Sequence, residues 1–426
     1  MMRWLIVTPL DVQTQPNNRE HHLLAHIAPR MRETVVVFRR RNDRAGALRL
    51  LLDTVVPRAH RSRAPGGTLM VSTNPPINTP QGMAMDIAGT YQMTPLGERA
   101  ADGRQVLLRL ISEAAILKDL LAMAWLFVCA QWMTRGRFEV CTALGPYGSA
   151  VARLLRATGK VGAYVYQDRD YEPGFVQTPM RNALARYLEN SGIRQADAVA
   201  TVGYRLSERR RQETGRMPVV ITSGVDAARF QAPARDLSAP VLVYTGNVTF
   251  WSGLEFVVDA LHAIRAVRPA RLLVVGEALP GYRALLEERI RALGLTAAVD
   301  FTGRVDNRSV PAYLASAHIG VAVFRPLALK QYASPLKVLE YMAAGLPCVG
   351  SLDMEVEDLL VRHGCGRAVP LQAEAIATAV LTMLDDPAAY REMSRRGREA
   401  ALTQYGWPTL MQREYELLQA CGRQEA

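Results

Sequence analysis

The chain has 426 residues, of which 49% are hydrophobic and 21% are charged. This length is sufficient for two domains of ordinary size, and this composition excludes disordered and fibrous proteins. The net charge is +11.

Short β-branched runs alternate with segments of helical period along most of the chain. Strands are predicted over residues 4–8, 34–38, 68–72, 138–144, 162–166, 197–202, 218–222, 240–245, 271–275, 298–302, 319–323, 346–350 and 367–369. Helices are predicted over residues 105–134, 148–158, 179–190, 203–214, 254–267, 281–293, 309–316, 335–344 and 371–384, with two more in the tail at 391–421. Such alternation predicts parallel sheets with right-handed crossovers. The α/β pattern breaks at an Ala-, Pro- and Asp-rich linker, residues 227–240, which predicts two Rossmann-like domains.

Two segments lack any period. Residues 40–65 and 73–104 are rich in Arg, Pro, Asn and Gly and are predicted to be long loops.

The positive charge lies in the first half of the chain. Residues 1–235 hold 32 Lys and Arg against 19 Asp and Glu, whereas residues 236–426 hold 19 against 21. This asymmetry indicates either an anionic partner, such as a membrane surface or nucleic acid, or an arginine-rich solvated face. No nucleic-acid-binding signature accompanies the charge, so nucleic acid is not expected.

An apolar segment, residues 116–138, bears on membrane contact. Its uncharged run from Leu120 to Thr134 is shorter than the roughly 18–20 residues that a spanning helix needs. It is either a buried helix or a helix that lies in the lipid interface, where Trp125 and Trp132 would anchor it.

The cysteines indicate the compartment. They are odd in number, widely spaced and without a C-x-x-C pair: Cys129, Cys141, Cys348, Cys365 and Cys421. This pattern argues against a disulfide framework and a structural zinc site. The apolar run in "MMRWLIVTPLDV" is too short for a signal peptide, so we expect a cytoplasmic protein.

The segment "SPLKVLEYMAAGLPCVG" (334–350) carries the clearest site signal. Ser334 and Pro335 are predicted to open a helix as N-cap and first residue. Lys337 and Glu340 are three residues apart and share a helix face. They are either a diphosphate-binding lysine with a ribose-binding glutamate, or an ordinary surface pair.

A second segment, "VLVYTGNVTFWSGLEFVVDAL" (241–261), predicts strand, glycine-containing loop and helix. Gly246 and Gly253 would let the backbone approach a phosphate, and the helix start at 253–255 offers free N–H groups. The segment is neither a Walker loop nor a G-x-G-x-x-G fingerprint.

Three segments together resemble a known family. "TGNVTFWSGLEFVV", "FTGRVDNRSVPAYLASAHIGVAVF" and "SPLKVLEYMAAGLPCVG", in this order, resemble the donor half of GT-B-fold glycosyltransferases of the large bacterial group 1, the mannosyl- and glucosyltransferase-like enzymes. "ITSGVDAARF" (221–230) is similar to the "NGVD…F" signature before their second domain. The resemblance covers roughly residues 190–405.

The resemblance implies two Rossmann-like domains that face each other across a cleft. Residues 1–232 would bind the acceptor and residues 233–405 the nucleotide sugar. A C-terminal helix near 408–421 would pack back on the first domain.

Carried over position by position, the resemblance implies a donor site. Glu340 matches the ribose-binding glutamate, and Lys337 lies where related enzymes place a diphosphate-binding lysine. Gly246 and Asn247 match the loop that faces the diphosphate. Gly303 and Arg304 match the turn near the base, and Ser334 lies at the start of the binding helix.

Three positions depart from the family pattern. Tyr332 replaces the first glutamate of the Glu-x7-Glu pair, so a retaining mechanism does not follow. Asn247 replaces an arginine, and Ser252 replaces a lysine. Lys337, Lys330 or Arg325 are the candidates to supply the missing positive charge.

Acceptor-side candidates lie in the first half. "NNREHHLLAHIAPRM" (17–31) follows the first strand, which places Glu20, His21 and His22 near the expected cleft; a surface helix start explains them as well. Asp168 and Asp170 follow the strand 162–166, where a carboxylate could act as general base. The alternative is a loop stabilised by neighbouring arginines. The D-x-D spacing is not read as a metal site, because GT-B enzymes usually need no metal.

The predicted function is transfer of a sugar from a nucleotide-diphosphate donor to a glycan or lipid-linked acceptor in cell-surface polysaccharide biosynthesis. The expected partners are these two substrates and an anionic membrane surface, with peripheral association at its inner face and no cofactor. The alternatives are a catalytically silent GT-B partner protein and a GT-B sugar-nucleotide epimerase.

Overall fold

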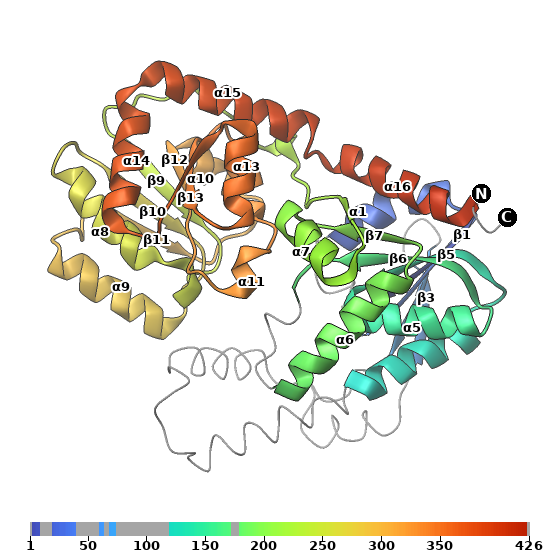
Figure 1. Ribbon diagram of the computed structural model, residues 1–426. Helices are drawn as coiled ribbons and strands as arrows, with labels where there is room; N and C mark the ends of the chain where they lie inside the picture. The colour runs from blue at the N-terminus through green and yellow to red at the C-terminus, as the bar shows by residue number, and fades with distance from the viewer. Residues whose placement is uncertain are drawn as a thin grey trace, which may run out of the picture. The chain divides into compact units, whose positions relative to one another are not determined.

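The computed structural model describes residues 2–8, 19–39, 59–63, 68–73, 119–171 and 179–423. The chain divides into two compact units. Unit 1 comprises Met1–Val202, Leu206–Ile221 and Met411–Ala426, and unit 2 comprises Gly203–Arg205 and Thr222–Leu410. Each unit contains one largely parallel sheet (Figure 1).

Unit 1 has an eight-stranded sheet in the order β3-β4-β2-β1-β5-β6-β7-β8. In chain order its strands are β1 (Arg3–Thr8), β2 (Glu33–Arg39), β3 (Ala59–Arg63), β4 (Leu69–Thr73), β5 (Phe138–Leu144), β6 (Val161–Asp168), β7 (Ala198–Thr201) and β8 (Val219–Val220). Only β3 runs antiparallel to its neighbour. Every residue of β6 is buried, as expected for a central parallel strand covered on both faces.

The helices of unit 1 cover this sheet. They are α1 (Arg19–His26), a helix over residues 119–133, α5 (Gly145–Ala157), α6 (Pro179–Gln195), most of α7 (Tyr204–Thr214) and most of the last helix, α16 (Trp407–Arg423). Within unit 1, α16 is held to α1 by an ion pair between Glu414 and Arg19, whose atoms lie 2.7 Å apart and are almost fully buried.

Unit 2 has a six-stranded parallel sheet in the order β11-β10-β9-β12-β13-β14. Its strands are β9 (Val241–Thr245), β10 (Arg271–Val275), β11 (Val299–Gly303), β12 (Ile319–Ala322), β13 (Cys348–Ser351) and β14 (Gly366–Val369). Its α-helices are α8 (Leu254–Arg265), α9 (Pro280–Ala292), α10 (Val310–Ala315), α11 (Ala328–Gln331), α12 (Leu336–Ala343), α13 (Glu355–His363), α14 (Ala373–Asp385) and α15 (Pro387–Thr403).

Two cores flank the sheet of unit 2. One contains buried residues of α8, α9 and α14, and the other contains buried residues of α10, α12 and α13. This three-layer arrangement explains why the strands read as continuous apolar runs, since both faces of the sheet are covered (Figure 1).

Two sequence predictions about local structure were wrong, and helices α11 and α13 were not predicted. Residues 59–63, predicted within a loop, form β3 at the sheet edge; its Arg-rich sequence lacks an apolar run because an edge strand is half solvated. Ser334 is not an N-cap: α12 begins at Leu336 with Pro335 at the N-cap position and without a side-chain cap bond. Residues 40–58, 64–67 and 74–118 lie outside the described residues. They include most of the two predicted loops, 40–65 and 73–104, and the first part of the predicted helix 105–134.

The helix over residues 119–133 has one buried face. Met123, Leu126, Cys129 and Ala130 join the core of unit 1, whereas Trp132 is 70% exposed. Among the residues that the structure describes, no helix has the length and apolarity needed to cross a membrane.

Candidate functional site

The strand order of unit 2 locates a candidate site. The chain runs from β9 through β10 to β11 on one side of the sheet, and from β12 through β13 to β14 on the other. In such sheets ligands bind beyond the carboxyl ends of the two strands at which the order reverses, here β9 and β12. A cavity of about 260 Å³ lies there. It is lined by Tyr244, Gly246, Asn247, Trp251, Phe324, Lys330, Ala333, Ser334, Pro335, Leu336, Lys337 and Val356.

Two glycines let the loops after β9 and β10 touch. Gly246 has a φ of +112°, and its N–H donates to the carbonyl of Val275 at 2.9 Å. Gly276 has a φ of +149°, and a Cβ placed there would lie 2.0 Å from the carbonyl oxygen of Gly246. Only glycine therefore fits at 276, and this close contact fixes the backbone that lines the cavity.

Lys337 contributes a cation to the cavity. Its ammonium nitrogen lies 3.5 Å from the centroid of the Tyr244 ring and 5.1 Å from that of Phe324. A Cβ on Gly246 would lie 3.6 Å from the same nitrogen. Burial, helped by the charge of Lys330, lowers the pKa of Lys337 to about 7.

Lys330, on α11, contributes a second cation. Its ammonium nitrogen lies 5.3 Å from the Trp251 ring and 5.9 Å from the Phe324 ring. The two lysines thus share one aromatic wall, formed by Tyr244 near the end of β9, Trp251 in the turn before α8 and Phe324 after β12.

Arg325 has a different environment. Its guanidinium pairs with Glu255 in the first turn of α8 and donates to the carbonyl of Phe250 at 3.2 Å. The arginine does not line the cavity. Of the three cations proposed to replace the missing family charges, the structure brings Lys330 and Lys337 together and leaves Arg325 neutralised by a carboxylate.

The positions of the two missing family cations differ in exposure. Asn247 is exposed and lines the cavity, and its carbonyl accepts from the Tyr244 hydroxyl at 2.9 Å. Ser252 is fully buried, and its hydroxyl donates to the carbonyl of Thr249 at 2.5 Å. A lysine at 252 would have no room without displacing the turn before α8.

Glu340 lies one helical turn beyond Lys337 but does not line the cavity. Burial raises the pKa of its carboxyl, while Lys337 and Arg229 lower it. Arg229 donates in turn to the carbonyl of Asn307 at 2.9 Å. The carboxylate therefore lies in the electrostatic field of two cations, Lys337 and Arg229.

The turn after β11 lies beside the glycine contact. Gly303 has a φ of +68° and forms a bridge with Gly276. The side chain of Arg304 is 85% exposed and lies 3.9 Å from Glu277. This turn therefore neighbours the cavity without lining it.

Asp168, predicted as a catalytic base, ends β6 in unit 1 and is 1% exposed. Its two carboxylate oxygens accept from the Arg210 guanidinium at 2.8 and 3.0 Å. Glu189 accepts from the same guanidinium through two bonds of 2.9 Å. Burial raises the pKa of Asp168 and the arginine opposes this shift, so the geometry favours a structural role.

The other acceptor-side candidates lie nearer the surface. Asp170 is exposed. The ring of His22 stacks on that of His26, with centroids 6.3 Å apart. Glu20 and His21 belong to α1, but their side chains lie outside the described residues.

Sequence reasoning missed the aromatic wall of the cavity. Tyr244 is the penultimate residue of β9, Phe324 follows β12, and Trp251 lies in the turn before α8. The available signal was the position of these aromatic residues at or shortly after the ends of buried strands. Within the described part of the chain, no group of three or more His, Cys, Asp or Glu is placed to hold a metal ion.

Comparison with known proteins identifies the domain that holds this cavity. Residues 239–386 match the family described as Glycosyl transferases group 1. A glycogen synthase of Mycobacterium tuberculosis is 29% identical over 195 residues, which cover 45% of this chain and 45% of that protein. The chain therefore spans less than half the length of that relative.

Two further similarities extend over more of the chain. A GDP-mannose-dependent alpha-(1-6)-phosphatidylinositol monomannoside mannosyltransferase of Mycolicibacterium smegmatis is 27% identical over 309 residues, covering 68% of this chain and 79% of that protein. The structure of Anabaena HepE in complex with UDP and glucose superposes with a TM-score of 0.64 at 17% identity, over 99% of this chain and 100% of that one. The fold is GT-B.

Proposed function

Residues 239–386 belong to the group 1 glycosyltransferases, and on this premise we propose that the chain transfers a sugar from a nucleotide-diphosphate donor to a glycan or lipid-linked acceptor. The observation that carries the proposal is the cavity at the strand reversal of unit 2, where two lysines lie beside a glycine loop.

Each part of the cavity suits one part of the donor. The leaving diphosphate would lie against Lys337, Lys330 and the glycine loop at Gly246 and Asn247, since ammonium groups stabilise phosphate oxygens and a glycine lets the backbone approach them closely. Stabilising this charge is the main chemical requirement, because the leaving group gains negative charge as the glycosidic bond to phosphate breaks. No resident cofactor enters this scheme.

The nucleoside would extend toward α12 and the turn after β11. In this scheme Glu340 accepts hydrogen bonds from the ribose hydroxyls, and the Gly303–Arg304 turn contacts the base. Ser334, which lines the cavity, would donate to a phosphate or sugar oxygen. Tyr332 stands where the family pair has its first glutamate, so we propose no stereochemical outcome.

Unit 1 would bind the acceptor. Asp170 and His22 are the proposed general-base candidates that keep solvent access, with Glu20 and His21 on the same helix as His22. The basic excess of residues 1–235 and the exposed Trp132 support peripheral association with an anionic membrane surface, as cell-surface polysaccharide assembly would require.

The donor site is tested by calorimetric titration of the full chain with UDP, GDP, ADP and dTDP. We expect one nucleotide to bind, with affinity lost in Lys337→Met and reduced in Glu340→Gln. Arg291→Met, which removes an exposed cation from α9, is the matched control and should bind normally. Failure of all four nucleotides to bind the wild-type chain would contradict the proposal and favour a catalytically silent partner protein.

A further inference from the structure

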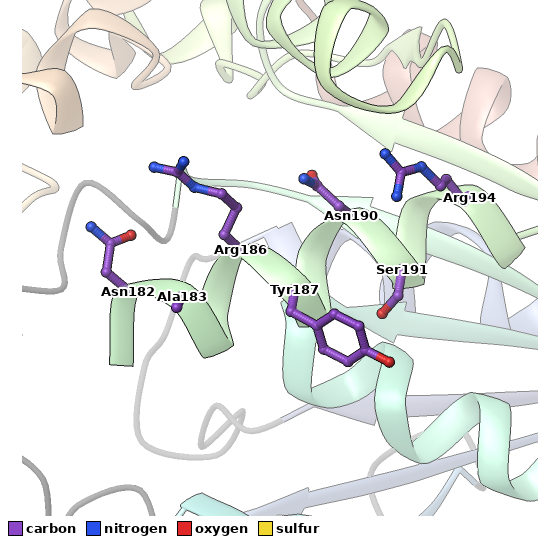
Figure 2. A pocket seen from close by; sticks show the side chains of 7 residues that line it. All are labelled: Asn182, Ala183, Arg186, Tyr187, Asn190, Ser191 and Arg194. Carbon is purple, nitrogen blue, oxygen red and sulfur yellow. The ribbon is translucent and has the colours of Figure 1, made fainter. Parts of the chain in front are cut away.

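One face of α6, in unit 1, carries a regular polar row. Asn182, Arg186, Asn190 and Arg194 recur every four residues and project from the same side of the helix, as Figure 2 shows. With Ala183, Tyr187 and Ser191 they line a cavity of about 480 Å³. The helical rise places successive members of the row about 6 Å apart.

The described residues that line this cavity include two arginines and no acidic residue. Arg186 is exposed. Arg194 donates to the carbonyl of Glu213 at 2.9 Å, which fixes its guanidinium and leaves further N–H groups for a ligand. Ser191 accepts from Arg153 at 3.0 Å. None of the residues that line this cavity is acidic, so its field favours an anion.

The row also contains two amide oxygens that accept no hydrogen bond from the described part of the chain. The side-chain oxygens of Asn182 and Asn190 are buried and have no hydrogen-bond partner among the described residues. Buried polar atoms are rarely left unpaired, and such an atom calls for an explanation. Because each oxygen is buried, its amide group must turn toward the cavity before a ligand hydroxyl can supply the missing donor.

The arginines and the unpaired amide oxygens together indicate one class of ligand. Arginine N–H groups bind an oxyanion more strongly than a neutral oxygen, and an unpaired amide oxygen accepts from an O–H or N–H donor. A neutral sugar leaves the positive charge of the arginines uncompensated, whereas inorganic phosphate alone cannot reach both amides. We propose that this face of α6 is an acceptor subsite for an acidic carbohydrate, one that carries a phosphate or carboxylate group beside free hydroxyls. The assignment as acceptor subsite rests on the proposed glycosyltransferase function.

The test measures binding of simple probes to the full chain by calorimetry. Glucose 6-phosphate and glucuronate should bind, and glucose should not bind detectably at the same concentration. Arg186→Gln should weaken both acidic sugars at least about tenfold, because a charge-assisted hydrogen bond is lost. Asn190→Leu should weaken both sugars while leaving the weaker binding of inorganic phosphate unchanged. Arg211→Gln, which removes an exposed arginine from α7 of the same unit, should bind as the wild type does.

Several results would overturn the proposal. Equal affinity for inorganic phosphate and glucose 6-phosphate would reduce the site to a simple anion site. Unchanged affinity in a folded Arg186→Gln variant would remove α6 from the site. Binding to vesicles of phosphatidylglycerol and phosphatidylcholine is measured separately for the wild type and for Arg186→Gln. If the variant loses vesicle binding and the wild type binds neither acidic sugar, this face of α6 contacts lipid instead.

The nucleotide titration separates this inference from the proposed function. Normal UDP or GDP binding without acidic-sugar binding would refute the α6 subsite alone. Acidic-sugar binding that depends on Arg186, in a chain that binds no nucleotide, would keep the carbohydrate site on α6 and refute its role in glycosyl transfer.

Discussion

The ammonium nitrogen of Lys337 lies 3.5 Å from the centroid of the Tyr244 ring. The ring stabilises the cation, but burial in the cavity is the stronger effect and lowers the pKa of Lys337 to about 7. A group that would anchor a diphosphate is thus partly neutral near physiological pH when the cavity is empty.

Nucleotide binding should therefore depend on pH. The diphosphate favours the ammonium form, and well below its pKa of about 7 the lysine is already charged, so protonation of Lys337 adds no pH dependence there. Above about pH 7 each binding event must take up a proton, and affinity should fall by up to about tenfold per pH unit. Calorimetry at pH 8 in buffers of different ionisation enthalpy measures this proton uptake directly.

Lys337→Arg is the matched variant for this experiment. Its guanidinium stays protonated throughout the range, so its affinity should be nearly independent of pH and no proton should be taken up. A flat pH profile in the wild type would contradict the role of Lys337.

The second diphosphate cation should be Lys330 and not Arg325. Lys330→Met removes a charge that lines the cavity and should weaken nucleotide binding about tenfold. Arg325→Met removes the partner of Glu255, so it should lower the free energy of unfolding by about 1–2 kcal/mol while changing affinity less than about threefold. Titration with the preferred nucleotide and urea unfolding of both variants decide between the two residues. Weaker nucleotide binding in Arg325→Met, with normal binding in Lys330→Met, would assign the diphosphate contact to Arg325.

Gly276→Ala should damage the cavity through the backbone. The new Cβ would lie 2.0 Å from the carbonyl oxygen of Gly246, so the loops must separate. We expect a loss of at least about 2 kcal/mol in unfolding free energy and a clear loss of nucleotide affinity. Gly281→Ala, in α9 with open space around its Cβ position, is the control; it should be neutral or stabilising by up to about 1 kcal/mol. Equal effects from the two substitutions, measured by thermal unfolding and titration, would exclude this explanation.

Asp168→Ala should destabilise the protein. The substitution leaves the fully buried Arg210 with fewer counter-charges, and breaking a buried pair costs about 3–5 kcal/mol. Asp170→Ala, at an exposed position two residues later, should change unfolding free energy by less than about 1 kcal/mol. Urea unfolding followed by circular dichroism measures both. If Asp168→Ala unfolds like the wild type but loses transferase activity, Asp168 is the catalytic base instead.

Much of the fold was predictable because both sheets are mainly parallel and buried. Their central strands are continuous apolar runs, so the predicted boundaries of 138–144 and 271–275 coincide with β5 and β10. Strand β3 escaped prediction because its register is set by pairing with β4 and not by its own hydrophobicity. Helix α13 begins with Glu355, Glu357 and Asp358, and this acidic first turn was an unused signal.

The site was predictable only in part. Gly246 and Lys337 follow strand ends, and their placement in one cavity follows from parallel topology. The pairing of Arg325 with Glu255 joins residues 70 positions apart, and the burial of Asp168 by Arg210 joins residues 42 apart. Such long-range partners depend on tertiary packing that no local pattern encodes.

The adjacency of β9 and β12 has a consequence for assembly of the protein. Two complete βα units lie between these strands in the chain, so the cavity between their ends exists only after β12 has inserted beside β9. A nucleotide that binds this cavity would therefore bind only the completed sheet. Above its dissociation constant, it would raise the free energy of unfolding in proportion to the logarithm of its concentration. If the proposed donor site is correct, the emerging chain would bind nucleotide only after α12 has left the ribosome, long after the glycine loop has been made.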